Sequence, residues 1–571
     1  MSSNQGKRWE VASIITTEAN EALSAFSPIM RQILFNRGQV TDAEARSYLE
    51  AIPDFDPSPS QMTGMNASVE RIRVALENKE QIAVYGDYDV DGVTATVLLV
   101  QALRALGGTV RGQIPNRFEE GYGLNNDALD KLKAEGCSLV ITVDCGIRSN
   151  EEAAHAKKIG LDLIISDHHQ PAEGDLPDAY SIINPKQGGD GYPDKDLAGV
   201  GVAYKLTQAL HEGSGQSPKG FQTEDLLDLV ALGTVADLAP LTGENRILVR
   251  KGLLKMRETK RQGLFSLAAV SDLSMMRITA TNIGFVLGPR LNAAGRLESA
   301  LAAFDLLITE DVKTAGELAQ QLNIQNQQRQ EITREIQAQA EAIVLEEDPT
   351  ADLLFAYHPE FNTGVIGLAA SRLSETYYRP AVVVGQESSE TLRGSCRSIP
   401  EFNITEALDQ CKDLLIRHGG HKAAAGFTVH KDHLDALKIR LKKIAKEKLQ
   451  GTDLRKTLLA DIEVPLSDLR PELLKHLDYL QPTGYGNPEA VFVSRDVRIT
   501  NARTVGAEGK HLKLVVTDGR ISFDSIGFRL GYLKPDLPLK VDLLYTFESN
   551  EYNGHTSLQL NLKDIKPAGT D

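Results

Sequence analysis

Residues 84–96 read VYGDYDVDGVTAT and lie between an apolar run and a helix-like segment. This stretch holds three aspartates at alternate positions: Asp87, Asp89 and Asp91. Like charges so close together repel, so a fold that keeps them together needs a cation to neutralise them. Because alternate residues of an extended segment point to opposite sides, a turn or a helix start is needed for two of them to face one site. We expect Gly86 and Gly92 to supply the backbone freedom for it.

Short β-rich runs alternate with helical segments around this stretch. The β-rich runs are IAVYGD (82–87), TVRGQIP (109–115), LVITVD (139–144) and LDLIISD (161–167), and helical segments at 93–106, 125–135 and 150–158 lie between them. This alternation predicts a parallel sheet with crossover helices. The region 196–310 has a mainly helical pattern.

The second half of the chain changes character twice. A polar segment from 311 to about 347 has no internal proline, and as one helix it would be about 55 Å long. A smaller α/β pattern follows, with a glycine-rich RHGGHKAAAGFTV (417–429) and a basic helix at 431–450. From about residue 454 many short β-like runs suggest a small barrel.

We therefore predict an α/β protein in which a parallel-sheet lobe is joined by a long helix to a smaller α/β lobe, with a C-terminal all-β barrel. The expected parts are an N-terminal helical cap (1–78), the parallel-sheet lobe (79–310), a linker helix (311–348), the smaller α/β lobe (349–452) and the barrel (453–571).

Composition narrows the classes of protein. A chain of 571 residues has room for three or four domains, and no apolar run reaches the roughly 18 residues that a membrane helix needs. The N-terminus lacks a signal pattern, so we expect a cytoplasmic protein. Four cysteines without CxxC spacing indicate reduced thiols. A net charge of −16 argues against an overall positive coat but allows a local basic groove for nucleic acid.

Acidic or imidazole side chains follow the apolar runs at four places. They are the three aspartates after IAVY, Asp144 after LVITV, the DHH triplet Asp167, His168 and His169 after LIIS, and Asp237 in LGTVAD. Ligands of open parallel sheets bind at the carboxyl ends of the strands, so these groups are expected to converge. Several carboxylates with one imidazole suit Mg²⁺ or Mn²⁺.

Each motif alone has a simpler interpretation. The three aspartates could be a solvated acidic turn or a calcium loop, although DYDVDGVTATVL lacks the glutamate at the twelfth position of an EF-hand. The histidines could be a structural pair at a helix start, and Asp144 or Asp237 could cap a helix N-terminus. Their joint occurrence at strand ends favours a metal site.

The order of the motifs brings a family resemblance. GDYDVDG, TVDCG, SDHHQP and GTVADLAPL resemble the four motifs of the DHH phosphoesterase superfamily, and GGHKAAAG resembles the signature of its second lobe, DHHA1. GPRLNAAGRLESA, RGSCRS, QPTGYGNPEAVF and the β-rich C-terminus narrow the resemblance to the RecJ family of single-strand-specific 5′→3′ DNA exonucleases.

The resemblance implies two divalent cations, Mn²⁺ or Mg²⁺. Asp89 and Asp144 would hold one ion, with Asp87 near it. The other ion would be held by Asp91, Asp144, His168 and Asp237. Asp167 would hold its neighbouring imidazole, and His169 would contact the phosphate as a donor or an acid.

The resemblance also implies that 79–310 is the DHH catalytic domain, that 349–452 is the DHHA1 substrate-binding domain and that the barrel, 453–571, is an OB-fold that binds nucleic acid. It further implies substrate-binding residues. The first lobe offers Arg290, Asn292 and Arg296, and the second offers Arg393, Ser395, Arg397, His418, His421 and Lys422. The alternative for the glycine-rich stretch is a plain turn between a helix and a strand. The barrel offers cations and aromatics, each of which could instead be a surface charge or a core residue: Arg495, Arg498, Arg503, Lys510, Lys513, Phe528, Tyr545 and Tyr552.

The implied function is release of 5′ mononucleotides from single-stranded DNA in repair and recombination. The implied partners are single-stranded DNA, single-strand-binding protein and a RecQ-type helicase, and we expect a monomer. Two alternatives stay open. One is an oligonucleotide, cyclic-dinucleotide or pyrophosphate hydrolase of the same superfamily, and the other is a non-catalytic replication scaffold.

Overall fold

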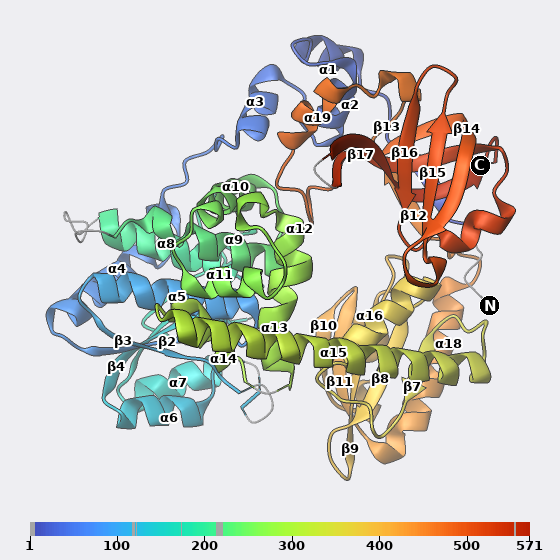
Figure 1. Cartoon of the computed structure of the whole chain (residues 1–571). Coiled ribbons are helices and arrows are strands. Elements are labelled where there is room, and N and C mark those ends of the chain that lie inside the picture. Colours follow the sequence, from blue (N-terminus) through green and yellow to red (C-terminus); the bar gives the residue numbers. More distant parts are fainter. Residues whose placement is uncertain are drawn as a thin grey trace. The chain divides into compact units, whose positions relative to one another are not determined.

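The computed structural model describes residues 6–116, 120–121, 123–172, 174–212, 221–297, 299–552 and 555–570 (Figure 1). The chain forms two compact units. One unit joins the segment up to Trp9 with Ile324–Leu458, and the other joins Glu10–Asn323 with Leu459–Asp571. Each unit therefore contains segments that are distant in sequence.

A five-stranded parallel sheet organises the first half of the larger unit. Its order is β3-β2-β4-β5-β6, and every neighbouring pair is parallel. The strands are β2 (Gln81–Gly86), β3 (Thr109–Gln113), β4 (Cys137–Val143), β5 (Asp162–Ser166) and β6 (Ser181–Ile183). The predicted parallel sheet is confirmed.

Helices cover both faces of this sheet. One face packs on α4 (Met65–Glu77), α5 (Val90–Ala105) and α8 (Gly199–Glu212), and the other on α6 (Asn126–Ala134) and α7 (Asn150–Lys158). Behind α5 lies the predicted helical region, with α9 (Leu227–Ala236), α10 (Gly243–Arg257), α11 (Gln262–Ala269), α12 (Ala280–Asn282), a π-helical turn (Ile283–Leu287), α13 (Gly288–Leu297) and α14 (Leu301–Ile308).

Helix α5 is buried on nearly every side, as its apolar sequence requires. Asp89 caps its N-terminus, and the Asp89 Oδ1 accepts hydrogen bonds from the backbone N–H groups of Asp91 and Gly92. The helix start predicted from the aspartate spacing is therefore present. It places Asp89 and Asp91 at the carboxyl edge of the sheet.

Gly86 and Gly92 are required for a different reason from the expected one. Neither Gly86 nor Gly92 has a positive φ. A Cβ at Gly92 would lie 2.5 Å from the backbone nitrogen of Asp87, and a Cβ at Gly86 would lie 2.0 Å from the Thr96 Oγ1. Close packing of α5 on the strand end, rather than backbone freedom, requires glycine at both positions.

The N-terminal helices pack differently from the expected cap. They are α1 (Thr17–Ala22), α2 (Pro28–Asn36) and α3 (Asp42–Glu50). Their apolar residues, such as Ile33 and Leu34, share one core with the C-terminal barrel, whereas only α4 joins the core of the parallel-sheet lobe. The N-terminal segment is thus mainly part of the barrel's core.

The C-terminal barrel is closed, as predicted. Its strands are β14 (Phe492–Val505), β15 (His511–Thr517), β16 (Ser522–Gly527), β17 (Lys540–Tyr552) and β18 (His555–Pro567). They follow the order β14-β15-β16-β18-β17, and β17 pairs back with β14. Strand β13 (Ile462–Glu463) pairs in parallel with β14, and helix α19 (Pro471–Asp478) precedes the barrel.

The smaller unit is built on a mixed sheet of order β10-β11-β9-β8-β7. Its strands are β7 (Leu354–Tyr357), β8 (Ala381–Gln386), β9 (Thr391–Arg397), β10 (Leu415–His421) and β11 (Ala424–His430). Its helices are α16 (Ile366–Tyr377), α17 (Ile404–Asp409) and α18 (Leu434–Leu449). The alternative of a helix-to-strand turn for GGHKAAAG is wrong, because this sequence forms the antiparallel hairpin of β10 and β11.

Three further expectations can be compared with the structure. The polar segment is one helix, α15 (Val312–Glu347). The four cysteines are buried and free. One element that the sequence did not predict is a short sheet that joins β1 (Arg8–Val11) to β12 (Thr457–Ala460). Within the described residues, each helix is too short or too polar to cross a membrane.

Candidate metal centre

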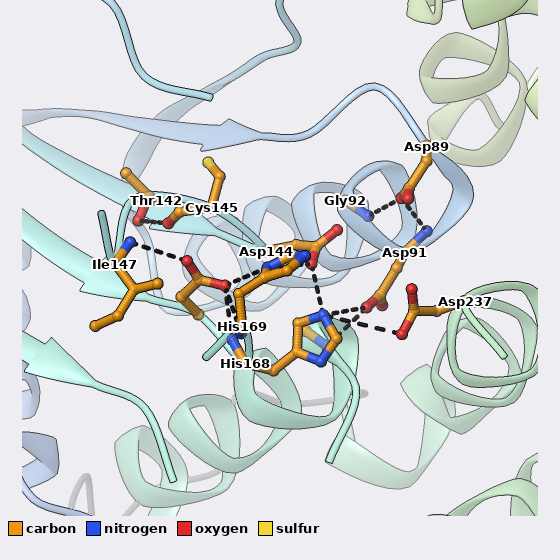
Figure 2. A network of polar contacts seen from close by, with 12 residues as sticks. Asp89, Asp91, Gly92, Thr142, Asp144, Cys145, Ile147, His168, His169 and Asp237 are labelled. Carbon is orange, nitrogen blue, oxygen red and sulfur yellow. Dashed lines mark hydrogen bonds and ion pairs between the residues drawn. The ribbon is translucent and has the colours of Figure 1, made fainter. Parts of the chain in front are cut away.

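The sheet register brings the predicted acids to one edge. Gly86 pairs with Val143, and Val143 pairs with Ser166, so the three strands end at the same level. The next residues along these strands are Asp87, Asp144 and Asp167. Asp237 comes from elsewhere, because it is the C-terminal cap of α9 and not a helix N-cap. The predicted convergence is observed: ligand atoms of Asp87, Asp89 and Asp144 lie within 4.8 Å of one another, and Asp91, Asp144 and Asp237 lie together in Figure 2.

The imidazole of His168 lies at the centre of this cluster. Its Nε2 is 3.1 Å from the Asp144 Oδ1 and 3.9 Å from both the Asp91 Oδ2 and the Asp237 Oδ2 (Figure 2). Three groups have ligand atoms within 4.8 Å of one another: Asp87, Asp89 and Asp144; Asp91, His168 and Asp237; and Asp144, His168 and His169. Asp144 and His168 each occur in two of these groups.

Asp91 is fixed by the N-terminus of α8. Its two carboxylate oxygens accept hydrogen bonds from the backbone N–H groups of Gly199 (2.7 Å) and Val200 (2.8 Å). The positive end of the helix dipole favours the charged form of this carboxylate. Each carboxylate oxygen has a second lone pair, so both remain able to bind a cation.

Asp144 is held in an unusual backbone conformation. Its φ is +61°, and its backbone N–H donates to the carbonyl of Ser166. Left-handed backbone at a non-glycine residue is often found at functional sites, where the surroundings compensate the strain. The start of α8 packs directly on this side chain, since a Cβ at Gly199 would lie 2.7 Å from the Asp144 Cβ.

Asp167 organises the two histidines. Its Oδ1 accepts hydrogen bonds from the backbone N–H groups of His168 and His169 and lies 2.8 Å from the Nδ1 of His169, while its Oδ2 accepts from the N–H of Ile147. The ring that Asp167 holds is thus that of His169. The carbonyl of His169 in turn accepts from the Asn184 side chain.

Burial shifts the pKa values of the cluster strongly. Burial, together with the charges of Asp91 and Asp89, raises the pKa of Asp237 to about 9. Burial and the charge of Asp89 raise the pKa of Asp91 to about 7, and burial raises the pKa of Asp144 well above its usual range. Burial and the charge of His169 lower the pKa of His168 to about 3, so its ring is neutral at pH 7.

The position of Asp237 adds to this repulsion. A carboxylate at a helix C-terminus faces the negative end of the helix dipole. A cation relieves all of these unfavourable interactions together.

His169 and Asp167 behave in the opposite way. Burial lowers the pKa of His169, but the hydrogen bond and charge of Asp167 outweigh it and raise this pKa above its usual range. Burial acts to raise the pKa of Asp167, but His169 outweighs that effect and lowers it. This pair therefore favours an ionised carboxylate beside a proton-donating imidazole.

The residues fit a divalent cation. The Asp144 Oδ1 and the His168 Nε2 are buried and make no hydrogen bond within the described part of the chain. Buried polar atoms of this kind are rare and need an explanation, such as a bound ion. Carboxylate oxygens with one neutral imidazole are the ligand set that Mn²⁺ and Mg²⁺ accept.

Two residues beside the site were missed from the sequence. Asn184 and Lys186 follow β6, the next strand of the sheet. The Asn184 Oδ1 accepts from the backbone N–H of Lys186, and the charge of Lys186 lowers the pKa of both Asp237 and His168. Their signal was available, since an NPK tripeptide directly after a fourth apolar run follows the same pattern as the other motifs.

Helix α13 carries the candidate substrate residues of the first lobe. The Asn292 Oδ1 accepts from the backbone N–H of Val90, so this side chain lies against the loop of the acids. The guanidinium of Arg290 donates hydrogen bonds to the Asn323 side chain and to the carbonyl of Val286. Arg296 lies in the last turn of α13.

In the smaller unit, alternate residues of β9 form a basic face. Arg393, Ser395 and Arg397 alternate with buried residues, so they share one side of the sheet. A Cβ at Gly367, in the first turn of α16, would lie 2.9 Å from the Ser395 Oγ. The basic face therefore adjoins a helix N-terminus, which favours an anion.

The hairpin β10–β11 forms the edge next to this basic face. His421 and Lys422 are exposed at its turn. His418 has another partner, because its Nε2 lies 2.8 Å from the Asp409 Oδ1. His418 is thus directed toward α17, whereas His421 is open to solvent.

Several candidates of the barrel have structural roles. Tyr545 is fully buried and bonds to the Ser494 hydroxyl, so for this residue the alternative of a core aromatic is confirmed. Arg495 pairs with Asp542 and Glu463, and Lys513 pairs with Asp524. Lys510 pairs with Glu508. Arg498, Arg503 and Phe528 are exposed, and the side chain of Tyr552 lies outside the described residues.

The sheet and its acidic edge define a class of protein. Residues 81–234 match the family model described as DHH family, N-terminal domain. Residues 350–447 match the DHHA1 domain, and residues 460–564 match the RecJ OB domain. A DHH phosphoesterase core thus carries two further domains.

Relatives of known name share this arrangement. The chain is 36% identical over 573 residues to the single-stranded-DNA-specific exonuclease RecJ of Salmonella typhimurium, covering 96% of this chain and 98% of the relative. It is 37% identical to RecJ of Bacillus subtilis, covering 94% of this chain and 68% of the relative. A crystal structure of RecJ from Thermus thermophilus with Mn²⁺ superposes with a TM-score of 0.84 at 31% identity, over 99% of this chain and 80% of that one. The chain belongs to the RecJ family.

Proposed function

We propose that this protein is a metal-dependent exonuclease that hydrolyses single-stranded DNA from its 5′ end and releases mononucleotides. The observation that carries the proposal is the convergence of five aspartates and His168 at one sheet edge, with buried ligand atoms that make no hydrogen bond. The relatives support the proposal, because RecJ of Salmonella typhimurium and RecJ of Bacillus subtilis are both named single-stranded-DNA-specific exonucleases.

We assign the ligands as the sequence predicted. Asp89 and Asp144, with Asp87 beside them, would hold one divalent cation, and Asp91, Asp144, His168 and Asp237 would hold the other. Related RecJ crystal structures contain Mn²⁺ or Mg²⁺. When bound, such a pair of ions activates a water and stabilises the charge that develops on a phosphodiester during in-line displacement.

The chain's own residues would orient the reacting groups. The α8 N-terminus fixes Asp91, and Asp167 fixes the ring of His169 at 2.8 Å. Because Asp167 raises the pKa of His169, this imidazole can donate a hydrogen bond or a proton to a phosphate oxygen. His169 is partly exposed, so a substrate can reach it.

The remaining candidate residues would bind the strand. We assign phosphate contacts to Arg290, Asn292 and Arg296 in the first lobe. In the second lobe we assign them to Arg393, Ser395, Arg397, His418, His421 and Lys422. The family resemblance supports the 5′→3′ direction, a cytoplasmic and monomeric enzyme, and a role beside single-strand-binding protein and a RecQ-type helicase.

The test is a nuclease assay with Mn²⁺ on single strands labelled at the 5′ or the 3′ end, on duplexes and on dinucleotides. We expect 5′ mononucleotides from long single strands, and no product with Asp144→Ala. Asp42→Asn, which changes an exposed aspartate on α3, is the matched control and should retain full activity. Release from the 3′ end contradicts the direction, dinucleotides as the only substrate favour the oligonucleotide hydrolase, and an inactive unmutated protein favours the scaffold.

A further inference from the structure

Helix α9 ends in a way that its sequence does not favour. The N–H of Ala239 donates to the carbonyl of Thr234, and the N–H of Leu238 donates to the carbonyl of Val235. These two bonds form a Schellman motif with Leu238 in the left-handed conformation (φ +61°). Glycine or asparagine is the usual residue there, because a larger side chain is strained in this conformation.

The strained leucine is also exposed to solvent. Leu238 is 68% exposed, so it contributes little to the core, and it directly follows the site residue Asp237. An apolar side chain that neither suits its backbone nor packs inside the protein needs another explanation. The position of Leu238 next to Asp237 offers such an explanation: the side chain can contact a ligand that is bound at the acidic cluster.

Two other segments that carry exposed rings pack against the end of α9 and the loop that follows it. The π-helical turn packs on the end of α9, since a Cβ at Gly284 would lie 3.8 Å from the Val235 Cγ1, and it carries Phe285, which is 80% exposed. π-Turns of this kind are frequent at functional sites.

The second segment is TGYGN (483–487), which lies directly before the barrel. The N–H of Leu241 donates to the carbonyl of Tyr485 at 2.7 Å. A Cβ at Gly486, whose φ is +76°, would lie 3.0 Å from the Pro240 Cβ, so this close approach requires glycine. Tyr485 itself is 65% exposed. Residues about 245 positions apart in sequence thus meet at the loop that follows Asp237.

We propose that Leu238, Phe285 and Tyr485, here called the apolar rim, bind the unpaired bases of the nucleotides next to the phosphodiester that is cleaved. This inference rests on the proposed function. The acidic cluster and its cations would bind the phosphate. The apolar rim would provide the surfaces on which the bases of the adjacent nucleotides stack. Bases inside a duplex stack on their neighbours, whereas the bases of a single strand can turn out and offer their faces, so the apolar rim favours single strands independently of the width of any channel.

The test uses the full chain and separates base contacts from phosphate contacts. The probes are an oligothymidylate and the same strand with abasic sites next to its 5′ end, and binding is measured by fluorescence anisotropy in EDTA. Leu238→Gly keeps the left-handed backbone without strain, so its melting temperature should equal or exceed that of the unmutated protein. We expect Leu238→Gly to weaken binding of the oligothymidylate about tenfold, as does Tyr485→Ala, while binding of the abasic strand changes less than about twofold.

Leu254→Ala is the matched control. Leu254 is 55% exposed near the end of α10 that packs on the start of α9, far along the helix from Asp237, and its replacement should change neither affinity. If Leu238→Gly and Tyr485→Ala lose affinity equally for both probes, or lose none for either, the proposal that the apolar rim binds bases is wrong. If Leu238→Gly fails to fold, Leu238→Asn provides the same comparison. An unmutated protein that binds both probes but hydrolyses neither with Mn²⁺ contradicts the proposed function. The measured affinities of the variants for the two probes still decide whether the apolar rim binds bases.

Discussion

The two sheets of this protein handle charge in opposite ways. The parallel sheet gathers acids at its carboxyl edge and buries them, so that Asp91 and Asp144 are almost completely inaccessible. The sheet of the smaller unit places basic groups at partly exposed positions of strand β9 and on the edge hairpin, where His421 and Lys422 are exposed.

The difference teaches how each region should respond to substitution. In the buried cluster each charge is felt by the others, because little water screens them, and the groups act as a unit. On the basic face and the hairpin, which are partly or fully exposed, water and salt screen the charges more, so contributions to binding are smaller and more nearly independent. We therefore expect steep losses in the first region and graded losses in the second.

The largest effect is expected from Asp144→Asn. It keeps the side-chain shape but removes the charge that two ligand groups share. We expect the rate of hydrolysis to fall by roughly a thousandfold or more, equivalent to about 4 kcal/mol of transition-state stabilisation. Single-turnover kinetics with saturating Mn²⁺ measures it, and a loss of less than tenfold would show that the cluster does not act as a unit.

Asp167→Asn should have the next largest effect. It weakens the contacts that hold the ring of His169 and the backbone of both histidines, without removing a proposed metal ligand. Loss of such supporting contacts costs about 10- to 100-fold in metal affinity or activity. Isothermal titration with Mn²⁺ and steady-state kinetics would measure both. An effect as large as that of Asp144→Asn would mean that Asp167 is itself a ligand.

Arg397→Gln tests the graded region. We expect KM for single-stranded DNA to rise several-fold with kcat little changed, and the slope of log affinity against log salt to fall by about one. Arg440→Gln is the matched control, because Arg440 is a partly exposed arginine of α18 that pairs with Asp413. A large drop in kcat would place Arg397 in the chemistry and would remove the contrast between the two regions.

The smallest effect concerns the stability of the metal-free protein. The pKa of Asp237 is about 9 in the fold against about 3.8 when unfolded, so the unfolded state loses its proton first. The folded state therefore loses stability relative to the unfolded state as the pH rises from about 4 to about 9. Asp237→Asn removes this contribution and should raise the melting temperature in EDTA at pH 8 by a few degrees.

The matching measurement is a melting curve at several pH values, with EDTA or Mn²⁺. Mn²⁺ should raise the melting temperature of the unmutated protein more at pH 8 than at pH 6, and should raise that of Asp237→Asn less. A variant that melts below the unmutated protein in EDTA at pH 8 would contradict the proposed repulsion.

Much of the fold could be predicted because its signals are local. The alternation of apolar runs and helices located the strands of the parallel sheet, and the lack of proline in 312–347 indicated one helix. The acids could be grouped because parallel strands end at one edge, which makes positions such as Asp87 and Asp144 neighbours without any knowledge of loops.

What could not be predicted depends on contacts between distant segments. Nothing near Ile33 indicates that it shares a core with Phe492, and nothing near Tyr545 distinguishes a core ring from an exposed one on a barrel whose alternation is broken by bulges. Gly92 was recognised as a glycine requirement, but its reason, the approach of the Asp87 backbone, appears only after packing. Glycine at GGHKAAAG suggested a turn, yet the same residues can also form an edge strand.

The shared core of α2 and the barrel has a consequence for synthesis. Ile33 and Leu34 leave the ribosome long before β14 is made, and at typical elongation rates of about 5–20 residues per second this interval is roughly half a minute or more. During that time the apolar side of α2 has no barrel to cover it, although the parallel-sheet lobe can already fold. Nascent chains should therefore depend on chaperones at their beginning rather than at their middle, and the order of translation leaves the first helices among the last elements to be buried.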